Sequence, residues 1–157
     1  MQKKFSFRLA NLFFMASLLV GNTGVLGTRL VAPSSAAAGT FTPVADAYVI
    51  STSASTNYGS AATLRVDGSP VTNSYLRFVV SSLNGATVQA ASLHIYANSA
   101  NTTGFSVKAV SNNSWAENTI TYSNAPAAGA SLNSSTAIAA GSWVTVDVTS
   151  YVKAAGT

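Results

Sequence analysis

Apolar and polar residues alternate in short runs along most of the chain after Pro43, and this pattern constrains the fold more than any other feature. In Ser142–Thr149, three valines occupy one parity, while Trp143, Thr145 and Asp147 occupy the other. Successive side chains of a β-strand point to opposite faces, so this period of two indicates half-buried strands with one solvated face. No stretch keeps a helical period, although Thr149–Ala154 fits one helical turn.

Seven runs fit the strand pattern, and clusters of Ser, Asn, Gly and Pro separate them as turn signals. They are Ala45–Ile50, Thr63–Asp67, Ser74–Val80, Ala91–Ala97, Phe105–Ser111, Thr119–Tyr122 and Ser142–Thr149. Short strands at regular spacing predict an all-β fold, specifically a jelly-roll-like β-sandwich. A jelly roll of eight strands needs more than these runs, so we expect the last strands of the domain to be missing.

The first residues have the pattern of an export signal. Lys3, Lys4 and Arg8 form a positive region, and Leu9–Val20 forms a short, mainly apolar stretch. A bilayer-spanning helix needs about 20 apolar residues, whereas a stretch of this length is typical of a signal peptide. The sequence therefore predicts a secreted, extracellular protein without a membrane span once the signal is removed.

Small residues mark the expected cleavage site. Ala36 and Ala38 fit the A-x-A rule, which makes Gly39 the first residue of the mature protein. The stretch from the apolar region to Ala38 is longer than usual, so an uncleaved anchor that keeps the domain at the membrane is the alternative. We expect a signal peptide and linker over residues 1–38 and one β-sandwich domain over residues 39–157.

The net charge of +4 belongs to the first thirty residues, which carry Lys3, Lys4, Arg8 and Arg29. The remainder balances four cations against four carboxylates: Arg65, Arg77, Lys108 and Lys153; Asp46, Asp67, Glu117 and Asp147. A nucleic-acid-binding protein needs a basic patch. The presumed mature part has no such excess, so no nucleic-acid partner is expected.

Only 8% of the residues are charged, against roughly 25% in an average soluble domain. The polar surface must therefore consist mainly of Ser, Thr and Asn. The chain has no cysteine, which excludes disulfides, thiol nucleophiles and Cys-ligated metal sites. Both features suit an extracellular β-protein with a neutral, hydroxyl-rich face.

No catalytic arrangement is apparent. The four carboxylates of the mature part have no spacing that selects an acid–base pair of the kind that glycoside hydrolysis needs. His94 is the single histidine, and no G-x-S-x-G motif accompanies it. His94 is expected to be a half-exposed strand residue, and the chain is expected not to be an enzyme.

Seven short motifs follow one another along the chain: Asp46–Val49, Asn57–Gly59, Leu64–Gly68, Ser74–Phe78, Ala91–Tyr96, Trp115–Pro126 and Asp147–Val152. In this order they resemble the DNRLRE-type domain, also grouped as carbohydrate-binding module family 96. Together they cover roughly residues 41–157. The resemblance implies a secreted, non-catalytic β-sandwich that binds an acidic polysaccharide and is linked covalently to neighbouring domains. The family continues past the last motif with further strands, so the resemblance also implies a fragment.

Residues outside the predicted core supply the chemistry that sugar binding needs. Aromatic faces stack on pyranose rings, and Arg matches a carboxylate with two parallel hydrogen bonds. We expect one aromatic–basic patch if the strands are neighbours, formed by Tyr75 with Arg77, His94 with Tyr96, Lys108, and Trp143 with Thr145. The predicted ligand-binding residues are Arg65, Arg77, Lys108, Tyr96 and Trp115.

Structural roles compete with binding at two of these positions. Arg77 lies in mid-strand, where pairing with Asp147 or Asp46 would fix the sandwich instead. Trp115 either offers a stacking platform or plugs the end of the core. Arg65 and Lys108 are the stronger predictions, although Asp67 shares the strand face of Arg65.

Two further expectations remain open. Asp46 with Asn57 could contribute to a structural calcium site, but no clustered acidic loop accompanies them. The alternative for Asp46 is a role in fixing a strand. The alternative function for the whole chain is a structural or adhesive extracellular module without a sugar site.

Overall fold

The computed structural model describes residues 5–8, 39–81 and 87–155. The predicted signal peptide and cleavage site lie outside these residues, except for a short strand at Phe5–Arg8. Over the stretches that are described, no helix is long and apolar enough to cross a membrane.

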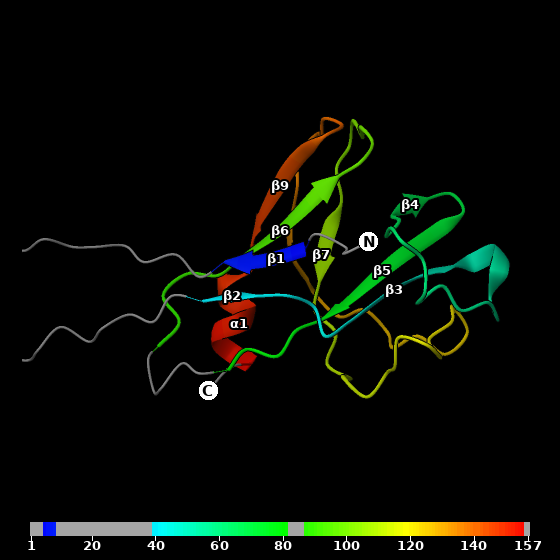
Figure 1. Cartoon of the computed structure of the whole chain (residues 1–157), viewed down its shortest axis with the longest axis horizontal. Helices are drawn as coiled ribbons and strands as arrows, with labels where there is room; N and C mark the ends of the chain where they lie inside the picture. The colour runs from blue at the N-terminus through cyan, green and yellow to red at the C-terminus, as the bar shows by residue number, and fades with distance from the viewer. Residues whose placement is uncertain (1–4, 9–38, 82–86, 156–157) are drawn as a thin grey trace, which may run out of the picture.

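The fold is an all-β sandwich of antiparallel sheets, as the alternation predicts (Figure 1). A four-stranded sheet has the order β2-β1-β6-β9: Thr40–Phe41, Phe5–Arg8, Ser92–Ala97 and Ser142–Asp147. A three-stranded sheet has the order β3-β5-β4: Ala45–Ile50, Val71–Arg77 and Asp67–Gly68. A separate pair consists of β7 and β8: Ser106–Lys108 and Ser131–Ser134. The short helices are η1 and α1: Ser51–Ser53 and Thr149–Ala155.

The pairing of β6 with β9 confirms the predicted parity of both strands. Leu93 pairs with Val146, and Ile95 pairs with Val144. Leu93 belongs to a core cluster with Val88, Ala91 and Val148, on which Ile95 and several residues of other elements pack. His94, Tyr96, Trp143 and Thr145 therefore occupy the opposite, outer face of this sheet.

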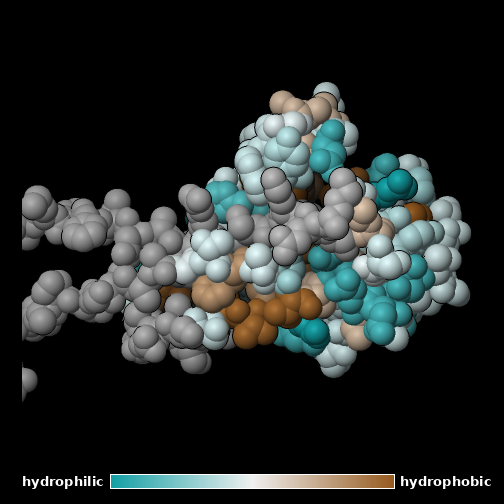
Figure 2. Space-filling view, in the orientation of Figure 1, coloured by the Kyte–Doolittle hydropathy of each residue, from teal (hydrophilic) through white to brown (hydrophobic). Residues whose placement is uncertain are grey.

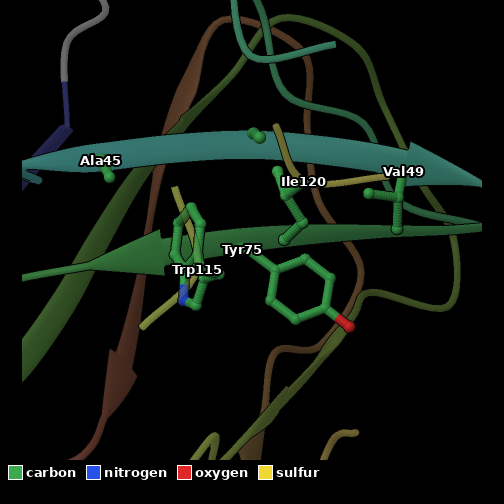
Figure 3. Packing of buried hydrophobic residues seen from close by; sticks show 6 residues of the cluster. Ala45, Val49, Tyr75, Trp115 and Ile120 are labelled. Carbon is green, nitrogen blue, oxygen red and sulfur yellow. The ribbon is translucent and has the colours of Figure 1, made fainter. Parts of the chain in front are cut away.

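A second core cluster covers one face of the β3–β5 pair (Figure 3). Ala45, Ala47, Val49 and Tyr75 contribute from the two strands, and Trp115 and Ile120 close over them from a long connecting segment. Tyr75 is 8% exposed, so its predicted place outside the core is wrong. The reason is that β5 is covered on both faces, since Leu76 and Phe78 pack against the first cluster.

The segment between β7 and β8, residues 109–130, is a loop that covers the second core cluster with Trp115 and Ile120. We call this segment the core lid. The predicted strand at Thr119–Tyr122 is wrong, because the amides of Thr119 and Ile120 both donate to the carbonyl of Ala116 in a turn. The predicted strand at Thr63–Asp67 is also wrong for most of its length, since β4 begins only at Asp67. Sequence alternation did not reveal β8, whose residues are mainly polar.

Gly59 packs closely against the backbone of this loop. It is buried, and a Cβ added there would overlap the carbonyl oxygen of Glu117. Backbone cannot move aside as a flexible side chain can. A glycine is therefore required at this contact.

Replacing Gly59 by Ala is expected to lower the free energy of unfolding by roughly 2 kcal/mol, because the core lid must shift. Denaturant unfolding followed by fluorescence measures this change. Gly68→Ala is the matched control, since nothing lies within 4 Å of the added Cβ. Equal stability of the two variants would contradict the close contact.

Candidate functional site

The predicted site residues fall on three different parts of the molecule. Arg77 lies on β5, Tyr96 on β6 and Lys108 on β7, and these strands belong to three separate sheets. The predicted aromatic–basic patch therefore does not form as a whole: β6 and β9 are neighbours, whereas β5 and β7 belong to other sheets. Lys108 is exposed and pairs with Ser131 beside a β-bulge.

The half-buried Arg77 and the buried Trp115 come together. The guanidinium of Arg77 donates to the carbonyls of Asn113 at 2.7 Å and Trp115 at 2.8 Å. It also lies over the indole ring, 5.4 Å from the ring centroid. Trp115 is 9% exposed and meets Tyr75 edge-on. This geometry gives Arg77 a structural role, and Trp115 closes the end of the core.

Asn57 holds the core lid from the other side. Its amide nitrogen donates to the carbonyls of Glu117 at 2.8 Å and Ile120 at 2.6 Å, and its oxygen accepts the Gly59 amide. The Glu117 carboxylate in turn accepts the amide of Asp46. Among the residues that the structure describes, no group of three or more His, Asp or Glu side chains is placed to hold a metal ion.

Two other carboxylates serve local turns. Asp67 accepts the amide of Ser69, and Asp147 accepts the amide of Thr149 at the start of α1. The hydrogen bonds from Thr149 hold the pKa of the Asp147 carboxyl below its ordinary value. The carboxylates of Asp67, Glu117 and Asp147 thus each accept a hydrogen bond from a different backbone amide and stabilise the backbone there.

Arg65 lies on an aromatic pad formed by Tyr48 and Tyr58. Its guanidinium carbon is 5.7 Å from the centroid of the Tyr48 ring, and the two tyrosine rings stack at 4.5 Å. Tyr48 is buried, whereas Arg65 is exposed. A cation over an aromatic face within about 6 Å is attracted by the ring quadrupole. Arg65 is thus preoriented while it stays accessible to solvent.

The backbone of Arg65 is fixed as well. Ser74 accepts the Arg65 amide at 3.2 Å and donates to its carbonyl at 2.6 Å through the same hydroxyl. Ser74 pairs with Tyr48 across the β3–β5 ladder, so one register places all three residues together. Sequence reasoning found Arg65 but missed both tyrosines. The sequence did carry a signal for each: Tyr48 lies in the predicted strand Ala45–Ile50, and Tyr58 lies in the Asn57–Gly59 motif.

Tyr96 and Trp143 form the second accessible aromatic group. They are cross-strand partners on the outer face of β6 and β9, with ring centroids 5.4 Å apart in an edge-to-face arrangement. Tyr96 is 40% exposed and Trp143 is 49% exposed. In the next pair, the Thr145 hydroxyl lies 3.2 Å from Nδ1 of His94. This arrangement offers flat aromatic rings beside a hydroxyl and an imidazole.

Replacing Arg77 by Lys is expected to lower the free energy of unfolding by about 1–2 kcal/mol, because Lys cannot reproduce the planar fork that reaches two carbonyls. Thermal or urea unfolding measures the change. Arg65→Lys is the matched control, since Arg65 is exposed and should tolerate it within about 0.5 kcal/mol. Arg77→Lys with wild-type stability would show that the carbonyl contacts do not stabilise the lid.

Comparison with known proteins agrees with the resemblance seen in the motifs. Residues 37–157 match the profile of carbohydrate-binding module family 96. A search of curated proteins gave no match. The match spans the whole described sandwich apart from β1, including Arg65 with its tyrosine pad and the outer face of β6 and β9. The chain therefore belongs to carbohydrate-binding module family 96.

Proposed function

We propose that the domain is a secreted, non-catalytic module that binds an acidic polysaccharide and holds a larger extracellular protein on it. Membership of a carbohydrate-binding family supports the ligand class. The finer choice of an acidic sugar depends on one observation, which is the exposed guanidinium of Arg65 held over Tyr48.

The chemistry of this group favours a carboxylated sugar. Arg presents a rigid fork of N–H donors that matches both oxygens of a carboxylate. The aromatic pad and the two Ser74 hydrogen bonds restrict the residue before binding, which lowers the entropy lost on association. Asp67, the nearest acidic residue in sequence, directs a carboxylate oxygen to the Ser69 amide.

Other cations have different positions. Lys108 is exposed on the β7–β8 pair and offers an additional point charge for an acidic chain. Arg77 already donates to two backbone carbonyls, so turning its guanidinium toward a ligand would break both of these hydrogen bonds. In Figure 2, hydrophilic and intermediate colours cover most of the part where β3, β4 and β5 lie, which suits contact with a hydrated polymer.

A structural or adhesive module without a sugar site is the alternative function. The Ser- and Asn-rich surface that suits a polysaccharide also suits contacts between surface proteins. A calcium ion near Asp46 and Asn57 remains a prediction for either function. Binding experiments separate the two functions.

Replacing Arg65 by Ala is expected to weaken binding to alginate about tenfold, because a charge-assisted hydrogen bond contributes roughly 1.5–3 kcal/mol. Affinity electrophoresis through alginate gels measures the loss, and added salt should weaken wild-type retardation. Lys153→Ala is the charge-matched control, since it removes one exposed cation from α1. Equal retardation of Arg65→Ala and wild type would reject this site. Unchanged mobility of folded wild-type protein in every acidic gel would favour the structural module.

Secretion has its own test. Expression of the full chain in a bacterial host with Sec export should yield an extracytoplasmic protein that begins at Gly39, because Ala36 and Ala38 fit the cleavage rule. Intact-mass measurement identifies the cut. A membrane-bound product of full length would instead support an uncleaved anchor.

A further inference from the structure

The outer face of β6 and β9 carries three consecutive cross-strand pairs: Tyr96 with Trp143, His94 with Thr145, and Ser92 with Asp147. None of these six side chains is Lys or Arg, and one of them, Asp147, is a carboxylate. The face therefore differs in charge from the Arg65 pad. The Asp147 carboxylate repels an anionic chain, whereas the hydroxyls of Ser92 and Thr145 and the ring nitrogens of His94 are groups that hydrogen-bond to sugar hydroxyls.

The aromatic pair is exposed and rigid at the same time. Each ring belongs to a paired β-strand, and the edge-to-face contact restricts both side chains. The end of the β6–β9 ladder is closed by a turn in which the Gly141 amide donates to the carbonyl of Ala97. Gly141 has φ of +72°, and a Cβ there would lie 3.7 Å from the Tyr96 hydroxyl. The positive φ favours glycine at this turn, and an added Cβ would make only an ordinary van der Waals contact with that hydroxyl.

We propose that this face is a second binding site, for a neutral pyranose chain, separate from the Arg65 pad. The Trp143 and Tyr96 rings stack on the C–H faces of a sugar, and His94 and Thr145 supply hydrogen-bond donors and acceptors along the strands. Ligand sites combine such apolar rings with a few polar groups that fix orientation.

The two sites belong to different sheets, since Tyr96 and Trp143 lie on β6 and β9, whereas the Tyr48 ring under Arg65 lies on β3 (Figure 1). The sandwich can then engage a neutral chain and an acidic chain together, as in a mixed extracellular matrix. Simultaneous engagement raises the effective affinity of two weak sites. This inference goes beyond the proposed acidic ligand and does not depend on Arg65.

Affinity electrophoresis in hydroxyethyl cellulose, a soluble neutral β-glucan, and in alginate tests the separation. Trp143→Ala should lose at least tenfold in affinity for the neutral polymer and keep its alginate binding, whereas Arg65→Ala should show the reverse. Tyr122→Ala is the matched control, since it removes another partly exposed aromatic ring. Circular dichroism verifies that each variant is folded.

A measurement on the wild-type protein avoids dependence on variants. Trp143 is the more exposed of the two tryptophans, so acrylamide should quench its fluorescence and the neutral glucan should protect it. Neutral-glucan binding by Trp143→Ala at wild-type strength would overturn the proposal. The proposal would also be overturned if the glucan did not protect Trp143 from acrylamide quenching. Protection that rises with protein concentration in the absence of glucan would overturn it too, because it would identify the face as a contact between copies of the chain. The effect of Arg65→Ala on alginate binding tests the acidic-polysaccharide site alone, so the failure of one proposal can be distinguished from the failure of the other.

Discussion

The fold depends on hydrogen bonds from a few side chains to the carbonyls of the core lid between β7 and β8. A loop over a core exposes backbone groups that no sheet can satisfy, and an unpaired buried carbonyl is costly. Four side chains donate these hydrogen bonds. Asn57 donates to the carbonyls of Glu117 and Ile120, and Arg77 donates to those of Asn113 and Trp115. The hydroxyl of Tyr75 donates to the carbonyl of Pro126, and that of Tyr151 donates to the carbonyl of Val110. With these bonds in place, Trp115 and Ile120 can close the second cluster without a facing strand.

This constraint separates residues that stabilise from residues that remain available. The motifs around Asn57, Arg77 and Trp115 serve the core lid, since the Asn57 amide and the Arg77 guanidinium donate to its carbonyls. Burial raises the pKa of the Tyr75 hydroxyl, and the nearby Tyr122 makes a smaller contribution. The raised pKa keeps the Tyr75 hydroxyl protonated, so that it can donate its hydrogen bond. The groups that we propose for ligand binding lie on the outside of the sheets: Arg65 over Tyr48 on one sheet, and Tyr96 beside Trp143 on another.

Local alternation predicted the fold class and four of the main strands well, because parity is a property of neighbouring residues. It placed His94 and Tyr96 outside and the valines of β9 inside. It failed at Thr119–Tyr122, where Asn124 bonds to the backbone of Thr119 and Thr121 and favours a turn over a strand. It also placed Tyr75 outside, since a period of two cannot reveal that both faces of a strand are covered.

The sequence by itself determined the all-β class, the family, and the balance of four cations against four carboxylates in residues 39–157. These follow from composition, from order along the chain and from parity. Only the tertiary structure decided which strands are neighbours, and hence that Arg65 meets Tyr48 while Arg77 turns inward to the core lid. The physical reason is that strand pairing and loop closure join residues far apart in sequence, such as Asn57 and Glu117, and no local pattern encodes such contacts.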